Sequence, residues 1–529
     1  MKQSSNDTNA KNSTVSKNGE SQIVTLVISL IILLVGNALF FLTIWLLNQY
    51  DRINIEQFLF AIKSSTVGTS GKVAGNAVWQ IGGLTVLLSG VEALIYLIVS
   101  GKFKPFIKIS RRYVKYTCSK ICRFMKETAL PFALAMFVFA LSFFIGKLEV
   151  VQYINVSSTE SDFIKLNYVN PNNVNLTFPK EKRNLVYIFL ESMETTYSDT
   201  SAGGTITHNF IPELSLLAEE NTNFSSTTEV GGALSFSGTT WTAAAMVAQT
   251  SGMLIKVPLN SQEYGGANSF LPGVSTIGEI LEQQGYNQTL LLGSDADFGG
   301  RKTYFTDHGN YNIVDINSLK EEGRLPQNYR QWWGYEDKKL FEFAKEEILK
   351  LHEEGKPFNF TMLTADTHFP DGYVCQDCEE NHTEQYANVL SCSSKKVYEF
   401  VNWLKEQPFY ENTTIVLCGD HLTMDPVFLE SVDQDYERTI YNCFINSAVS
   451  PIIEKNRRFG TFDMFPSTLA AMGVHIPGNR LGIGTNLFSE EITLTEKLGF
   501  EKLDEELQKK SLFYNEEILE MESVEGKIQ

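Results

Sequence analysis

Acidic and imidazole side chains stand directly behind short apolar runs in the second half of this 529-residue chain. Glu191 follows LVYIFL, and the adjacent Asp420 and His421 follow TIVLCG. Carboxylate and imidazole ligands together suit manganese, magnesium or zinc. A single carboxylate after a strand is often only the cap of the next helix. An adjacent Asp-His pair rarely serves a turn, so these residues indicate a divalent metal site.

Two further apolar runs are also followed by polar residues. These are Ser294, Asp295, Asp297 and Arg301 after QTLLLG, and Asp366 and His368 after FNFTMLTA. A helix cap is the favoured explanation for Asp295 taken alone. Polar residues behind four of the five strands predicted below are nevertheless more than loops need by chance, which favours a shared site.

A candidate nucleophile lies in the segment GGALSFSGTTWTAAAMVAQTSGM, residues 231–253. The segment leads through Thr239 and Thr240 into TAAAMVAQ, which has a high helix propensity. A threonine hydroxyl would then lie at a helix N-terminus, where free N–H groups and the helix dipole favour an anion. On local sequence alone, Thr239 or Thr240 as a helix cap is the commoner case. A nearby metal that lowers the pKa of the hydroxyl favours a nucleophile instead.

The elements that must position these residues form an alternating pattern. Five apolar runs are predicted as buried strands: Leu185–Leu190, Gln288–Leu292, Phe358–Leu363, Thr414–Cys418 and Thr439–Ile445. Residues 275–284, 337–354 and 391–406 have the spacing of amphipathic helices. The alternation predicts an α/β domain in which helices sandwich a mostly parallel sheet. Such sheets bind ligands beyond the carboxyl ends of their strands, where the polar residues fall.

Three apolar stretches near the start are long enough to span a bilayer, which takes about 20 helical residues. They are Ile23–Leu47, Val78–Ser100 and Thr128–Ile145. Nine basic residues lie between Lys102 and Lys126, so the positive-inside rule places this connection in the cytoplasm. The N-terminal lysines agree, and everything after about Gly146 is expected outside. The first stretch is too long for the apolar core of a signal peptide, and two more follow it.

These patterns divide the chain into five parts. Residues 1–22 form a polar cytoplasmic tail expected to be disordered, 23–147 a membrane domain, 148–183 a linker, 184–489 the α/β domain and 490–529 a helical extension. The net charge of −18 argues against a nucleic-acid partner. A domain this acidic needs local positive charge to bind phosphate, and a bound cation is the obvious source.

The seven cysteines divide between the two sides of the membrane. Cys118 and Cys122 fall in the cytoplasmic connection and are expected as thiols. Five are expected outside: Cys375, Cys378, Cys392, Cys418 and Cys443. A disulfide from Cys375 or Cys378 to Cys392 is one hypothesis. The other is that Cys375-x-x-Cys378 is half of a zinc site, although no second half follows at the usual spacing. Cys418 is the candidate for the thiol left over.

The motifs NLVYIFLESMETTY, GTTWT, TADTHFPDG and CGDH together resemble the lipoteichoic acid synthase family of sulfatase-like enzymes, in the alkaline phosphatase superfamily. GTTWT and THFPDG are most similar to the phosphoglycerol transferase branch, which decorates periplasmic glucans or surface polysaccharides. DMFPSTLAAMG and RLGIGTNLFS resemble the closing segment of that family. The motifs stand in the family's order over about Asn184–Ser489.

The resemblance implies transfer of glycerol phosphate from phosphatidylglycerol to a cell-surface or periplasmic glycan, through a phosphothreonine. It implies a multi-pass protein of the cell membrane with an extracytoplasmic catalytic domain. Four residues match the ligands of one manganese or similar ion, such as magnesium or zinc: Glu191, Thr240, Asp420 and His421. Thr240 also matches the nucleophile. Arg301 matches an arginine that holds the phosphoglycerol group, and His368 a histidine that faces the substrate phosphate.

Departures from the family pattern leave alternatives open. Gly299 stands where lipoteichoic acid synthases have the tryptophan of F-W-N-R, and three predicted spans replace their usual five. Both departures disfavour a synthase that polymerises glycerol phosphate. A phosphoethanolamine transferase using phosphatidylethanolamine would share the nucleophile and the metal. A sulfatase would need Cys or Ser in a C/S-x-P-x-R setting, which GTTWT lacks. The intact metal-type residues disfavour a non-catalytic receptor or scaffold.

Overall fold

The computed structural model of the chain describes residues 6–49, 53, 55–63, 75–99, 113–257, 269–332, 334–430, 432–433 and 435–519. The chain divides into two compact units, one of residues 1–49 and 71–151 and the other of residues 50–70 and 152–529. The first unit overlaps the segment predicted as the membrane domain. Residues 50–70 lie between the first two predicted spans in sequence but group with the α/β unit.

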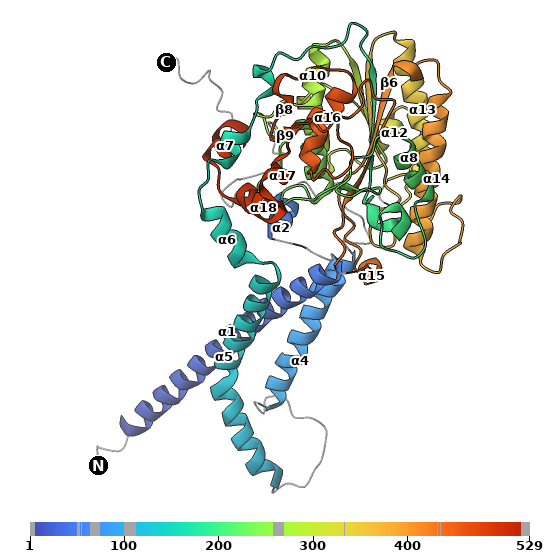
Figure 1. The fold of residues 1–529 in the computed structure, drawn as a ribbon. Helices are drawn as coiled ribbons and strands as arrows, with labels where there is room; N and C mark the ends of the chain where they lie inside the picture. Colours follow the sequence, from blue (N-terminus) through green and yellow to red (C-terminus); the bar gives the residue numbers. More distant parts are fainter. Residues whose placement is uncertain are drawn as a thin grey trace, which may run out of the picture. The chain divides into compact units, whose positions relative to one another are not determined.

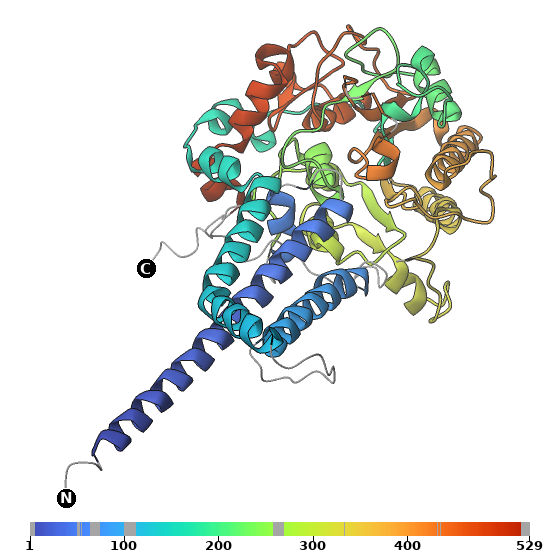
Figure 2. The ribbon, with the colours of Figure 1, turned by 90° about the horizontal axis from the view of Figure 1, so that it is seen from below.

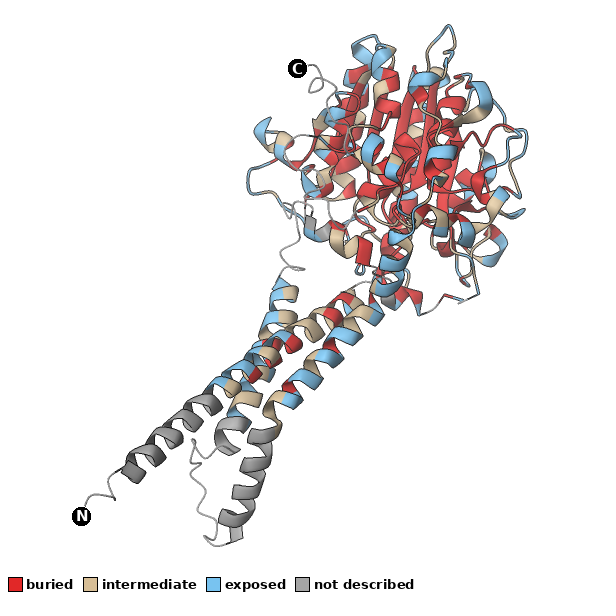
Figure 3. Cartoon of the chain, turned by 90° about the vertical axis from the view of Figure 1, so that its left-hand side faces the viewer, coloured by how far each residue is buried: buried red, intermediate tan, exposed pale blue. Residues whose placement is uncertain are grey.

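The first unit consists of long helices, drawn in blue to cyan in Figure 2: α1 (Asn6–Gln49), α4 (Leu84–Val99) and α5 (Tyr113–Lys147). Three stretches are long and apolar enough to cross a membrane: Val24–Gln49, Gly75–Ile95 and Thr128–Lys147. They overlap the three predicted spans. Most of their residues are exposed or half-buried (Figure 3), as lipid-facing apolar residues without protein partners would be.

Helices are also present in the segments predicted as a tail and as a linker. Helix α1 begins at Asn6, where the polar composition predicted disorder. The predicted linker contains the helices α6 (Val150–Ser158) and α7 (Phe163–Asn167). The first part of the basic connection, residues 100–112, lies outside the described residues, and α5 begins at Tyr113.

A seven-stranded sheet in the order β2-β7-β6-β1-β5-β3-β4 forms the centre of the second unit. The strands are β1 (Asn184–Leu190), β2 (Gly232–Ala233), β3 (Asn287–Leu292), β4 (Asn312–Val314), β5 (Phe358–Leu363), β6 (Thr413–Gly419) and β7 (Ile440–Ile445). Neighbours from β6 through β4 are parallel, whereas β7 is antiparallel to β6 and to β2. The five predicted strands and the mostly parallel sheet are confirmed. Strands β2 and β4 are too short to produce a periodic pattern.

Alternate side chains of each strand enter separate cores on the two faces of the sheet. In β1, Tyr187 and Phe189 join one core, whereas Val186 and Ile188 join the other. The first core includes α9 (Thr242–Ser251), α10 (Ile277–Gln283) and α16 (Met464–Ala471). The second includes α8 (Pro212–Glu220), α13 (Asp337–Glu353) and α14 (Gln385–Lys405). Burying one such apolar side chain stabilises the fold by about 1.5–3 kcal/mol. The helices therefore sandwich the sheet, as predicted (Figure 1).

The register of the sheet determines which strand ends meet. Leu190 of β1 pairs with Gly419 of β6, so Glu191 and Asp420 are the next residues on adjacent strands. Strand β5 flanks β1 on the other side, where Leu363 pairs with Phe189. Because β7 is antiparallel, its carboxyl end lies at the opposite edge. This explains why no candidate site residue follows the fifth predicted strand.

The described part of the segment after residue 489 contains helices and packs into the core of the second unit. It contains α17 (Leu494–Leu498), α18 (Phe500–Gln508) and a π-helical turn, η9 (Tyr514–Leu519). Leu503, Leu507, Tyr514 and Ile518 are buried in the same core as α9 and α16. This packing makes the extension part of the α/β unit.

Candidate active site

Glu191, Asp420 and His421 meet at the carboxyl edge of the sheet, as their positions in sequence predict. All three residues are buried, and one ligand atom from each lies within 4.8 Å of the others. His421 Nε2 is 3.6 Å from Glu191 Oε1 and 3.4 Å from Asp420 Oδ2. Ligands about 2.1 Å from an ion at tetrahedral angles are about 3.4 Å apart, so these separations suit one shared ion.

Two atoms in this group have the chemistry of metal ligands. Asp420 Oδ1 accepts hydrogen bonds of 2.7 Å from the backbone N–H groups of Ser192 and His421. Asp420 Oδ2 is buried and accepts no hydrogen bond from the described residues, which is costly for a carboxylate unless a cation binds it. His421 Nδ1 lies 2.8 Å from the Leu422 carbonyl oxygen, so Nδ1 carries the proton and Nε2 presents its lone pair. The residues therefore fit a divalent cation.

The electrostatics of Glu191 also indicate a cation. Burial and the neighbouring Asp420 raise the pKa of Glu191 well above its usual range. A 2.9 Å hydrogen bond from the Ser192 hydroxyl and the charge of Arg301 oppose this rise in pKa. A divalent ion between the two carboxylates would be the largest local charge and would reverse the effect of burial.

Thr240 lies just ahead of α9, whose N-cap is Trp241 without a side-chain capping bond. Neither Thr239 nor Thr240 is therefore the helix cap. Thr239 is fully buried, and its hydroxyl donates to the Phe236 carbonyl oxygen at 2.8 Å and accepts from the Phe236 N–H at 3.1 Å. Thr239 thus holds a turn, whereas Thr240 is half-buried and is the better candidate nucleophile of the two.

The hydroxyl of Thr240 has a partner that the sequence did not suggest. Gln57 of α2 (Ile55–Lys63) donates a hydrogen bond from Nε2 to Thr240 Oγ1 at 2.6 Å. One turn further along α2, the Phe60 ring lies 5.0 Å from the Trp241 ring, and Phe60 is buried in the core with α9. Helix α2 thus covers the segment that carries the candidate nucleophile. The available signal was a short amphipathic segment, IEQFLFAIK, between two membrane spans.

A second contact places α2 against the α/β unit. The Glu56 carboxylate is buried and accepts a hydrogen bond of 3.4 Å from the Val257 N–H. Burial raises the pKa of Glu56 to about 7, although the neighbouring Lys256 lowers it. This contact and the ring contact of Phe60 fix the face of α2 that carries Gln57.

Arg301 lies at the start of α11 (Arg301–Asp307) and is buried. Its Nε donates to the Phe298 carbonyl oxygen at 2.9 Å, and its Nη2 to the Asp295 carbonyl oxygen at 2.8 Å and to Ser294 Oγ at 3.1 Å. Burial lowers the pKa of Arg301 to about 10, opposed most strongly by Glu191, so the guanidinium remains charged at neutral pH. Arg301 therefore supplies positive charge beside the carboxylates.

His368 contributes a neutral imidazole to the same edge. Burial, helped by the neighbouring His421 and Arg301, lowers its pKa to about 3, although the hydrogen bond to the Phe369 carbonyl oxygen opposes this shift. Its Nδ1 lies 2.6 Å from the Phe369 carbonyl oxygen, so Nδ1 carries the proton and Nε2 presents a lone pair. Gly299 has φ +67, a backbone conformation that favours glycine. Two aromatic rings lie beside Arg301 and His368. The Phe298 ring is 5.6 Å from the Arg301 guanidinium, and the Trp332 ring is 6.0 Å from the His368 ring.

A second hydroxyl of the GTTWT motif also approaches the metal-type group. Thr242 is the first residue of α9, and its Oγ1 lies 3.4 Å from His421 Nε2. The sequence suggested only Thr239 and Thr240, because the exact start of the helix was not known. The contact makes Thr242 the nearest competitor of Thr240 for the role of nucleophile.

Comparison with known proteins identifies relatives of this chain. The chain is 33% identical over 255 residues to phosphoglycerol transferase I of Salmonella choleraesuis, and 32% identical over 255 residues to that of Citrobacter koseri. Each match covers 47% of this chain and 32% of the relative, so the chain spans about a third of the length of these curated relatives.

Comparison with solved structures gives two further matches. A protein of the alkaline phosphatase superfamily from Vibrio parahaemolyticus matches with a TM-score of 0.44 and 21% identity, over 62% of this chain and 77% of that one. The lipoteichoic acid synthase LtaP from Listeria monocytogenes matches with a TM-score of 0.45 and 18% identity, over 63% and 81%.

A family model described as sulfatase matches residues 183–474, which is more than half of the chain. The matched segment holds β1, β5 and β6 and every candidate site residue predicted from the sequence. The protein belongs to the sulfatase family.

Proposed function

We propose that the protein is a membrane-anchored, metal-dependent phosphoglycerol transferase, which moves glycerol phosphate from phosphatidylglycerol to a cell-surface or periplasmic glycan. The observation that carries this proposal is the buried group of Glu191, Asp420 and His421 in the same unit as Thr240, which lies just ahead of α9. The identity of 33% to a phosphoglycerol transferase I supports the choice of transferred group.

Glu191, Asp420 and His421 would hold the ion, with the Thr240 hydroxyl as a further ligand. A divalent cation bound there would lower the pKa of that hydroxyl and neutralise negative charge on the phosphate. Manganese is the proposed ion, because two carboxylates and one imidazole suit it, and magnesium and zinc are the alternatives.

In the first half of the reaction, Thr240 Oγ attacks the phosphorus of phosphatidylglycerol. The bond from phosphorus to the diacylglycerol oxygen breaks, the threonine proton passes to solvent, and the departing oxygen takes up a proton. The first N–H groups of α9 favour the phosphate anion beside Thr240. Arg301 donates charge-assisted hydrogen bonds to the phosphate oxygens. The product on the enzyme is glycerophosphothreonine.

In the second half, the oxygen of a glycan hydroxyl bonds the same phosphorus and its proton passes to solvent. The bond from phosphorus to Thr240 Oγ breaks, and Thr240 Oγ takes up a proton. His368 presents the lone pair of Nε2, which can accept a hydrogen bond from a substrate hydroxyl and orient it. Arg301 keeps the phosphate in place through both halves. The glycan acquires the glycerol phosphate, and the enzyme returns to its starting state.

The three candidate membrane spans anchor the enzyme to the bilayer that holds its lipid donor. The basic residues of the connection after the second span support a catalytic unit outside the cytoplasm. A glycan of the cell envelope is then the acceptor on the same side as the active site.

The test is a donor assay with the full chain in vesicles. One vesicle preparation contains phosphatidylglycerol as the only candidate donor, and the other contains phosphatidylethanolamine. Diacylglycerol release is measured in both with a glycan acceptor present. We expect release from phosphatidylglycerol and its loss in Thr240→Ala. Release from phosphatidylethanolamine alone would favour the phosphoethanolamine transferase, and products with several glycerol phosphates would favour a polymerising synthase. Release from neither lipid would overturn the proposal.

A further inference from the structure

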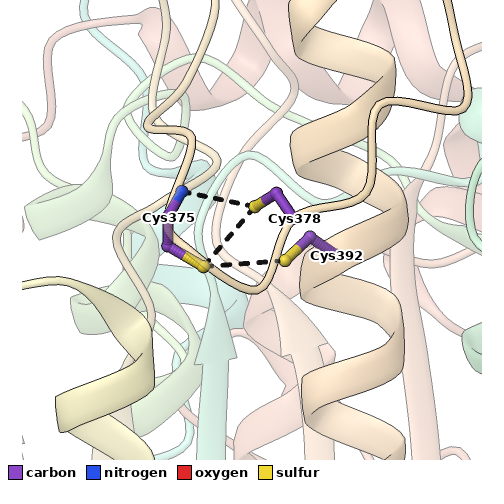
Figure 4. Close-up of side chains that lie close together, drawn as sticks. All are labelled: Cys375, Cys378 and Cys392. Carbon is purple, nitrogen blue, oxygen red and sulfur yellow. Dashed lines mark hydrogen bonds between the residues drawn. The ribbon is translucent and has the colours of Figure 1, made fainter.

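Three cysteines form a compact group between α14 and the connection that carries His368. Cys375 and Cys378 lie in the connection between β5 and α14, and Cys392 lies in α14. Cys375 Sγ is 3.5 Å from Cys378 Sγ and 3.8 Å from Cys392 Sγ (Figure 4). All three sulfur atoms lie within 4.8 Å of one another. Thiols from two separate elements thus converge on one point.

The separations suit a metal site. With Zn–S bonds of about 2.3 Å, two sulfur ligands at a tetrahedral angle are about 3.8 Å apart. A disulfide bond is only about 2.05 Å long. The three residues of the disulfide hypothesis, Cys375, Cys378 and Cys392, therefore lie together but are all free thiols. Cys418 and Cys443, in β6 and β7, are also free and buried.

The surroundings of Cys375 Sγ favour a thiolate at this position. Cys375 Sγ accepts a hydrogen bond from the Asp377 N–H, and Cys378 Sγ accepts one from the Cys375 N–H, both at 3.3 Å. The Lys396 ammonium lies 2.9 Å from Cys375 Sγ, and its side chain is only 11% exposed. Thiolates are the form of cysteine that binds metals.

We propose that Cys375, Cys378 and Cys392 bind a zinc ion that is separate from the ion of the candidate active site. Soft thiolates select zinc over manganese or magnesium. If manganese occupies the candidate active site, the two sites would hold different metals. Three thiolates and Zn²⁺ carry a net charge of −1, and the Lys396 ammonium lies between this charge and the Asp366 carboxylate. Among the described residues, no fourth His, Cys, Asp or Glu is grouped with these three sulfur atoms, so a water molecule would take the fourth position of a tetrahedral ion.

The zinc ion would fix the His368 loop to α14. Lys396 of α14 bonds both Cys375 Sγ and Asp366 Oδ2, the latter at 3.2 Å. The Asp366 carbonyl oxygen accepts from the Tyr373 N–H at 2.7 Å, which closes the loop that contains His368. Both ends of this loop are therefore tied to one helix through Lys396 and the sulfur group. Loss of the metal should loosen the loop without removing any ligand of the candidate active site.

Metal analysis of the purified full chain tests the proposal directly. We expect about one zinc per chain, held by the cysteines, its loss in Cys378→Ser, and its retention in Cys443→Ala, which removes a buried thiol of β7. Cys378 is the most exposed of the three, so its replacement disturbs packing least. Glu191→Gln should keep this zinc, which separates the cysteine site from the candidate active site. Zinc that persists in Cys378→Ser, or is lost in Glu191→Gln alone, would overturn the proposal.

Thiol chemistry on the wild-type protein gives a second test that does not depend on a variant folding. We expect the three thiols to resist alkylation in the native protein and to react after a zinc chelator is added, as read by mass spectrometry of the peptides. A disulfide between any two of the three, or rapid alkylation without chelator, would contradict the zinc site. Neither measurement uses the transfer reaction, so their failure leaves the proposed function standing, and failure of that function leaves the zinc site standing.

Discussion

Gln57 lies about 180 residues before Thr240 in sequence, yet its amide donates to the hydroxyl proposed as the nucleophile at 2.6 Å. Gln57→Leu keeps a similar volume and removes the hydrogen-bond donor. If the donor remains in place while negative charge develops on Thr240 Oγ, it stabilises the transition state more than the ground state. The variant should then lose turnover while the fold persists.

The size of the loss depends on the charge of the acceptor. A hydrogen bond between neutral groups contributes about 0.5–1.5 kcal/mol, and one to a charged group about 1.5–3 kcal/mol. At about 1.4 kcal/mol for each factor of ten, the charged case predicts a fall in kcat/KM of about 10- to 150-fold. The neutral case predicts a fall of about 10-fold at most. The measured factor therefore reports whether Gln57 acts on the charged oxygen.

The assay is diacylglycerol release from phosphatidylglycerol vesicles, with metal content measured in parallel. Ile62→Ala is the matched control, because Ile62 lies on the same short helix and is 63% exposed. We expect Ile62→Ala to retain the wild-type kcat/KM. An unchanged kcat/KM in Gln57→Leu, or equal losses in both variants, would refute a role for Gln57 at the nucleophile.

Three further predictions concern the metal, the protonation of His368 and the topology. Exhaustive chelation should abolish transfer, and manganese should restore it better than calcium, because the ligand set is small and includes an imidazole; full activity after chelation would contradict the proposed metal site. The pKa of His368 is lowered from 6.5 to about 3, so its contribution to stability is complete above pH 6.5 and is lost as the pH falls toward 3. His368→Asn should therefore lose less stability than the wild type between pH 7 and pH 5 in thermal unfolding, and equal losses would contradict the shift. An impermeant thiol reagent should label cysteines introduced after Val150 in intact cells but none introduced between Lys102 and Lys126, and labelling of the basic connection would reverse the topology.

The carboxyl edge of the sheet was predictable because its residues are encoded locally. Each apolar run is a strand, and the polar residue that follows it lies at the strand end. Parallel neighbours then bring Glu191 beside Asp420 through the pairing of Leu190 with Gly419. The antiparallel direction of β7 could not be predicted, because an apolar run has the same composition in either direction.

The remaining features depend on contacts between distant segments. Gln57 reaches Thr240 only after α2 joins the α/β unit, and no local pattern records that contact. The approach of Thr242 to His421 depends on where α9 begins, which is the least predictable property of a helix. The cysteine spacing suggested half of a metal site, but the position of Cys392 on the facing helix required the fold.

The most direct test of the central claim is the identity of the residue that carries the covalent intermediate. The wild-type protein is incubated briefly with phosphatidylglycerol, quenched in acid and digested, and fragment spectra locate any added mass within residues 231–253. The proposed mechanism predicts a glycerophosphoryl group on Thr240, and on the serine in Thr240→Ser. An adduct on Thr242 or Thr239, or no adduct in a preparation that transfers glycerol phosphate, would contradict it.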